Sequence, residues 1–197
     1  KYRRLYVRLC KSCYDQKMNI DIAKLKSFKK ILVTGPQRSG TTIAGHILAK
    51  ELDYKYYDER DVGVRSLSQL FDKLMSKESL VVQGPCFCSI VQWVDSPETA
   101  IVIMKRNIEE IVESEAKINW SEEKKELQNY YKDDGIISVT RYKTWEKYQK
   151  PNMKVPYFEL NYSSLKNHPM WIEKEARKNF RREISPPSSG AIQKKNS

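Results

Sequence analysis

One segment of the chain combines two glycines, a basic side chain and two hydroxyl side chains: Gly35-Pro-Gln-Arg-Ser-Gly-Thr-Thr42. Glycine lets a backbone approach an anion closely, and consecutive N–H groups at the start of a helix attract negative charge. The spacing is that of a phosphate-binding loop between a strand and a helix, although a glycine turn with a purely structural role has the same composition. The segment predicts that Ser39, Gly40, Thr41 and Thr42 donate to a phosphate group and that Arg38 places a positive charge beside it.

The loop departs from that of nucleoside triphosphatases. Thr41 stands where those enzymes have a lysine that contacts the β- and γ-phosphates, and they also hold magnesium with an acidic residue at the end of a strand. Here one expected strand ends in Gln83 and the next in Arg106, so neither supplies a carboxylate. The pattern favours an anion that is transferred without a metal and balanced by basic side chains. A sulfuryl group, which carries less charge than a phosphoryl group, fits that description.

Three segments resemble the sulfotransferases that use 3′-phosphoadenosine 5′-phosphosulfate (PAPS). Residues 36–42 look like that family's 5′-phosphosulfate-binding loop, with Gln37 as a one-residue insertion. Arg106 and Ser114 have the spacing of the pair that grips the 3′-phosphate. The segment Tyr162-Ser-Ser-Leu-Lys-Asn-His-Pro169 is similar to one whose tyrosine lies near the adenine.

The resemblance covers residues 31 to about 180 and implies transfer of a sulfuryl group from PAPS to an acceptor hydroxyl or amine, such as one on a carbohydrate or a small molecule. Arg38 would bridge the phosphate and the leaving oxygen. Each basic or hydroxyl residue also has a plainer interpretation. Arg38 could lie on the surface, Ser114 could be an exposed serine, and Arg106 could form a strand-end ion pair with Glu109, Glu110 or Glu113.

The sequence does not mark a general base clearly. The cytosolic branch of the family has a K-x-H segment after its third strand, where this chain has Gln83-Gly-Pro-Cys-Phe-Cys88. Branches that act on carbohydrates use a carboxylate after the second strand, which makes Glu59 the candidate base and Asp58 its rival. A carboxylate can deprotonate a hydroxyl if its pKa is raised. The charged turn could equally be solvated, and His46 and His168 are weaker candidates.

Short β-branched runs alternate with helix-period stretches from residue 30 onward, which predicts a P-loop-type three-layer α/β fold with a central parallel sheet flanked by helices. Expected strands lie at 31–35, 54–58, 79–83, 99–106 and 155–161; expected helices lie at 41–52, 64–76, after Asn107 with Glu110 in a capping box, and on both sides of 133–135. The domain is expected at 31–183, between a basic segment at 1–30 and a disordered basic tail at 184–197.

Composition limits the class of protein. The chain of 197 residues is 40% hydrophobic and has no apolar run long enough to cross a bilayer, which predicts one folded core without a membrane span. Its four cysteines are too sparse for a secreted disulfide framework, which predicts a cytoplasmic protein. The net charge of +11 is concentrated at the two ends, which could contact a polyanion. Cys10 and Cys13 have the spacing of half a zinc site, but reduced thiols are the more ordinary interpretation.

Two other functions stay open: a divergent P-loop nucleotide kinase or hydrolase, and a non-catalytic binding protein.

Overall fold

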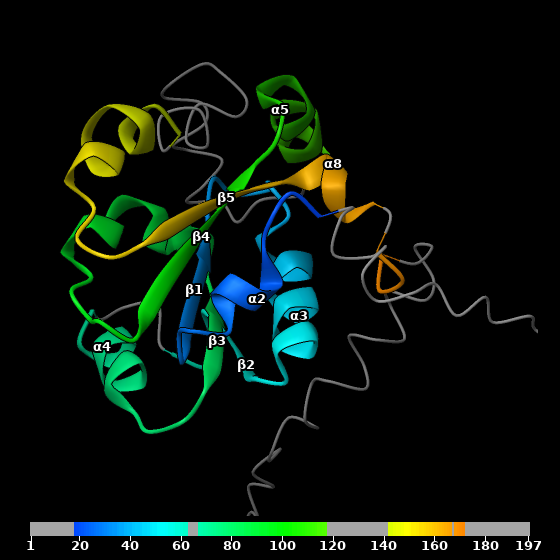
Figure 1. Ribbon diagram of the computed structural model, residues 1–197. Helices are drawn as coiled ribbons and strands as arrows, with labels where there is room; N and C mark the ends of the chain where they lie inside the picture. Colours follow the sequence, from blue (N-terminus) through cyan, green and yellow to red (C-terminus); the bar gives the residue numbers. More distant parts are fainter. Residues whose placement is uncertain (1–17, 63–66, 118–141, 167, 172–197) are drawn as a thin grey trace, which may run out of the picture.

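The computed structural model describes residues 18–62, 67–117, 142–166 and 168–171. Its central element is a five-stranded parallel sheet (Figure 1). The strands are β1 (Lys30–Thr34), β2 (Lys55–Asp58), β3 (Leu80–Gln83), β4 (Thr99–Lys105) and β5 (Tyr157–Asn161). Their order in the sheet is β2-β3-β1-β4-β5, and every neighbouring pair is parallel. The predicted α/β three-layer fold is therefore confirmed.

The strand β1 lies at the centre of the sheet. Leu32 is in register with Val82 of β3 on one side and with Ile101 of β4 on the other, and all five residues of β1 are buried. A chain that leaves β1 therefore emerges between two strands whose carboxyl ends face the same way. Ligands of open α/β sheets bind at such a point, where neighbouring connections diverge.

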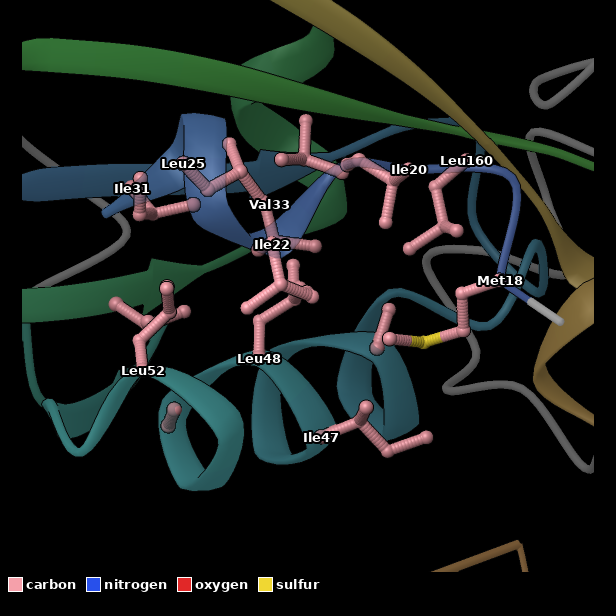
Figure 2. Packing of buried hydrophobic residues seen from close by; sticks show 14 of the residues in the cluster. Met18, Ile20, Ile22, Leu25, Ile31, Val33, Ile47, Leu48, Leu52 and Leu160 are labelled. Carbon is pink, nitrogen blue, oxygen red and sulfur yellow. The ribbon is translucent and has the colours of Figure 1, made fainter. Parts of the chain in front are cut away.

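Helices cover both faces of this sheet. One layer holds α2 (Ile22–Leu25), α3 (Thr41–Leu52) and α8 (Tyr162–Leu165), and the other holds α4 (Leu67–Met75), η1 (Pro85–Ser89), η2 (Val91–Trp93) and η3 (Trp145–Gln149). Two further elements are α5 (Ile108–Ala116), which follows β4, and the short turn η4 (Lys150–Asn152). Because side chains alternate along a strand, Ile31 and Val33 pack toward α3 (Figure 2). Leu32 packs toward α4 on the other face.

The segment before β1 is part of the core. Met18, Ile20, Ile22 and Leu25 are buried and pack with α3 (Figure 2), and the Asp21 side chain caps α2 by accepting from the Lys24 N–H at 3.1 Å. Residues 18–29, although basic overall, therefore contribute apolar side chains to the folded body.

Local details differ from the sequence prediction at the start of α5. The Asn107 side chain caps the helix as predicted, accepting from the Glu109 N–H at 2.7 Å, but Glu110 pairs with Arg106 instead of closing a capping box. The first of the two helices expected around 133–135, the tail at 184–197, and Cys10 with Cys13 lie outside the described residues. The second expected helix overlaps η3. None of the helices in the described ranges is long and apolar enough to cross a membrane.

Candidate functional site

The loop between β1 and α3 depends on its two glycines. Gly35 has φ 148°, and a side chain there would come within 2.9 Å of the Met104 carbonyl oxygen. Gly40 has φ 96°, and a Cβ there would lie 2.6 Å from the ring of Tyr162. Arg38 also has a positive φ, 65°. The loop is therefore held in a conformation that larger residues at the two glycine positions would disturb.

The amino end of α3 supplies the hydrogen-bond donors. Ala44 is the first residue whose N–H donates along the helix, to the carbonyl oxygen of Gly40 at 3.1 Å. The N–H groups of Thr41, Thr42 and Ile43 precede it and have no partner within the helix. Together with the helix dipole, these groups can bind an anion at the carboxyl edge of the sheet.

Ser39 is oriented differently from the prediction that it offers both N–H and hydroxyl donors. Its N–H donates to the Pro36 carbonyl oxygen at 3.1 Å, so this donor is used within the loop. Its side chain is fully buried, and within the described part of the chain its Oγ has no hydrogen-bond partner. A Cβ on Gly35 would lie 3.0 Å from that Oγ, which places the hydroxyl on the inner side of the loop.

A buried hydrogen-bond chain orients Thr41. The Tyr56 hydroxyl donates to Oε1 of Gln83 at 3.1 Å, and Nε2 of Gln83 donates to Oγ1 of Thr41 at 2.9 Å. Burial, and secondarily the nearby charge of Asp58, raises the pKa of the Tyr56 hydroxyl, so the group stays protonated and acts as the donor. Gln83 and Thr41 are 4% and 5% exposed. The end of β3 thus presents an amide to the loop.

Four of the predicted site residues come together beside the loop. Nε of Arg38 donates to Oγ of Ser114 at 3.1 Å, and Nη1 of Arg106 donates to the Arg38 carbonyl oxygen at 2.9 Å. The guanidinium of Arg106 also stacks on the ring of Tyr162 at 4.0 Å, and that ring packs against Gly40. The three motifs at 35–42, 106–114 and 162–169 therefore meet at one end of the sheet.

Arg106 is already paired. Its Nε donates to Oε2 of Glu110 at 2.8 Å, which is the strand-end ion pair considered from the sequence. Hydrogen bonding to Arg106 holds the pKa of Glu110 below its usual range. An anionic ligand that binds Arg106 must compete with this carboxylate.

A pocket of about 380 Å³ opens beside Arg106. It is lined by Arg106, Glu110, Glu113, Ser114, Lys117, Tyr162 and Lys166. Lys117 and Lys166 were not singled out from the sequence, yet they follow Ser114 by three residues and Tyr162 by four. That spacing places each lysine about one helical turn beyond Ser114 or Tyr162, at the carboxyl ends of α5 and α8, and could have identified them.

The two carboxylate candidates for the base differ in their surroundings. Asp58 accepts from the N–H groups of Arg60 and Asp61 at 2.8 and 3.2 Å and pairs with the Arg60 guanidinium at 3.0 Å, so it stabilises its own turn. Glu59 is half-buried, and a Cβ on Gly84 would lie 3.2 Å from its Cβ. Across the described residues Glu59 makes no hydrogen bond or ion pair with another side chain. Of the two candidate bases, Glu59 is therefore the carboxylate that is not already used in hydrogen bonds within the described residues.

The two histidines have packing roles. The His46 ring stacks on Tyr56 with centroids 3.9 Å apart. His168 is buried, its Nδ1 accepts from the Met170 N–H at 3.1 Å, and its Nε2 lies 3.4 Å from Oε1 of Glu51. Glu51 is in the last turn of α3, at the end of that helix opposite the loop. His168 is thus separated from the anion-binding donors by the length of α3.

The parallel sheet and the glycine loop between β1 and α3 define a P-loop fold. No protein-family model matches the chain, and no curated protein matches it. Among solved structures, it is similar to the YorR protein from Bacillus subtilis in complex with phosphorylated GDP, with 10% identity, a TM-score of 0.45, and coverage of 78% of this chain and 95% of that one. It is also similar to shikimate kinase from Acinetobacter baumannii in complex with shikimate, with 14% identity, a TM-score of 0.45, and coverage of 83% and 97%. Neither likeness assigns a function.

Proposed function

We propose that the protein is a sulfotransferase that uses PAPS as donor and an acceptor hydroxyl or amine, such as one on a carbohydrate or small molecule. The observation that carries this proposal is the meeting of the phosphate-type loop with Arg106, Ser114 and Tyr162, through the contacts from Arg38 to Ser114 and from Arg106 to the loop carbonyl. These are the segments in which the sequence resembles that family.

The groups present suit a nucleotide with two separate anionic groups. The N–H groups of Thr41 and Thr42 would bind a 5′-phosphate, because they stand at the start of α3. Arg106 and Ser114, which line the neighbouring pocket, would bind a 3′-phosphate there, with Lys117 and Lys166 adding positive charge. The phosphate would replace Glu110 as the anionic partner of Arg106.

The bound donor supplies an activated sulfuryl group: the acceptor oxygen or nitrogen bonds to sulfur, the bond from sulfur to the 5′-phosphate oxygen breaks, and its electron pair stays on the phosphate. Arg38 is exposed at the tip of the loop and would meet the charge that develops on this oxygen. Glu59 would accept the acceptor's proton, since it is half-buried near the end of β3.

A P-loop nucleotide kinase is the second candidate. The observation that favours it is the glycine spacing, since Gly35 and Gly40 are separated by four residues and Thr42 stands at the hydroxyl position of a nucleoside-triphosphate loop. Against it, Thr41 replaces the lysine and Gln83 presents an amide beside that position.

Ligand-dependent thermal unfolding separates the two candidates. 3′-Phosphoadenosine 5′-phosphate, the desulfated product, should raise the Tm without magnesium, because a ligand that binds only the folded state stabilises it. ATP should do so weakly, with or without Mg²⁺. A larger shift with ATP and Mg²⁺ than with the 3′-phosphorylated nucleotide would favour the kinase.

A further inference from the structure

We infer that Gln83 is a positioning residue that fixes the Thr41 hydroxyl as a donor to the ligand and keeps the loop independent of a divalent cation. The inference rests on the proposed function, because it assumes that the loop binds a nucleotide phosphate. It goes beyond that function by assigning a role to the end of β3.

The orientation of the Gln83 amide in this structure sets the direction of both hydrogen bonds. The Tyr56 hydroxyl donates to Oε1 of Gln83, so the other end of that amide, Nε2, must face Thr41. Nε2 can only donate, and Oγ1 of Thr41 therefore accepts. A hydroxyl that accepts this bond keeps its single hydrogen for another partner. At the amino end of α3, the partner that this hydrogen suits is an anion.

Burial and close packing hold the side chains of Gln83 and Thr41 in place. Gln83 and Thr41 are almost fully buried. Gly45 of α3 packs closely on the same group, since a Cβ there would lie 2.9 Å from the Tyr56 ring and 3.0 Å from Cβ of Gln83. The Gln83 side chain is thus packed between Tyr56 of β2 and Gly45 of α3, and both ends of its amide are hydrogen-bonded.

A carboxylate in this position would act in the opposite way. A glutamate has the same shape as glutamine, but it can only accept, so it would draw the Thr41 hydrogen toward itself and away from the ligand. It would also place a negative charge next to the phosphate. A divalent cation could then bridge the carboxylate and the phosphate, as strand-end carboxylates do in nucleoside triphosphatases.

The first test is the variant Gln83→Glu, with binding of 3′-phosphoadenosine 5′-phosphate measured by calorimetry with EDTA and with millimolar Mg²⁺. Without metal, the affinity should fall by about tenfold or more, the loss expected for a hydrogen bond to a charged group. Mg²⁺ should restore part of the affinity in the variant and should not raise that of the wild type. Gln92→Glu, in η2, is the matched control for the added charge and should bind like the wild type.

A double-mutant cycle tests whether Gln83 acts through Thr41. Gln83→Met should weaken binding by about fivefold in the wild-type background, as expected for a hydrogen bond of ordinary strength. It should have no further effect in Thr41→Val. Thermal unfolding without ligand identifies any variant that fails to fold, and Tyr56→Phe, which removes only the first bond of the chain, then serves in its place with a smaller loss.

The outcomes distinguish the inference from the proposed function. If the wild type binds the nucleotide but Gln83→Glu binds it equally well without metal, or Gln83→Met weakens binding equally in both backgrounds, the inference is wrong and the proposed function stands. If the wild type binds neither this nucleotide nor ATP, both are overturned. If it binds ATP only with Mg²⁺, the independence from a cation is refuted together with the sulfotransferase proposal.

Discussion

Nη1 of Arg106 donates a hydrogen bond to the backbone carbonyl oxygen of Arg38 at 2.9 Å, across 68 positions of sequence. This bond joins the carboxyl end of β4 to the tip of the loop that follows β1. Arg106 therefore holds the shape of the loop as well as lining the pocket beside it. The two roles predict different responses to mutation.

Arg106→Ala should weaken the binding of two nucleotides to different extents. 3′-Phosphoadenosine 5′-phosphate should lose about 1.5 to 3 kcal/mol more binding free energy than adenosine 5′-phosphosulfate, which has no 3′-phosphate, because a charged hydrogen bond is lost. Both should lose some affinity, because the Arg38 carbonyl is released. Calorimetric titration of both ligands checks this, with Arg106→Lys as a variant that keeps the charge. Equal losses for the two nucleotides would mean that Arg106 only supports the loop.

Arg38→Ala should lower turnover more than it weakens binding of the desulfated nucleotide. The reason is that its charge is needed when the bond to sulfur breaks, whereas the N–H groups of α3 bind the phosphate in either state. Initial rates and product affinity measure the two effects separately. Arg38→Lys, which keeps a positive charge at the tip of the loop, is the matched control and should retain part of the turnover. Unchanged rates in Arg38→Ala would remove this side chain from the chemistry.

Gly40→Ala should lower the free energy of unfolding by about 1 to 3 kcal/mol, the cost of forcing a residue with a side chain into a left-handed conformation. The new Cβ also meets the Tyr162 ring at 2.6 Å, which should open the loop and reduce nucleotide binding. Urea unfolding gives the stability. Adding Tyr162→Leu should recover part of the loss, since it removes the atoms that clash; a double variant no more stable than Gly40→Ala would assign the whole effect to the backbone.

Because His168 is buried, we expect the free energy of unfolding to depend on pH. Burial lowers the pKa of its imidazole, although the charge of Glu51 acts in the opposite direction and that of Lys50 in the same one. The unfolded chain therefore binds a proton more readily, and the free energy of unfolding should fall as the pH drops below about 6.5, by at most about 1.4 kcal/mol per pH unit. Urea midpoints across this range test it.

The control for this dependence is His168→Gln, in which the decline below about pH 6.5 should be shallower than in the wild type. If that variant does not fold, Glu51→Gln provides the comparison. Removing the Glu51 charge lowers the pKa of His168 further, which should extend the decline to lower pH. Parallel curves for the wild type and the variant would exclude His168 as the source.

The sequence alone determined the features that depend on near neighbours. The helix predicted at 41–52 matches α3, and each predicted strand lies within three residues of its observed bounds, because β-branched runs and helical periodicity act locally. The glycine spacing of the loop is local in the same way, since each glycine is required by its own backbone angle.

The tertiary structure decided which of the predicted residues contact one another and which hydrogen bonds and ion pairs they form. Nothing in the sequence shows that Arg38 donates to Ser114, 76 positions away, or that the Gln83 amide reaches Thr41 across 42. The strand order puts β1 between β3 and β4, and only that order brings Gln83 and Arg106 to opposite sides of one loop. The sequence left Glu109, Glu110 and Glu113 as possible partners of Arg106, and the structure pairs it with Glu110. Hydrogen bonds and ion pairs between distant segments follow from the arrangement of the folded chain, and residue spacing does not specify that arrangement.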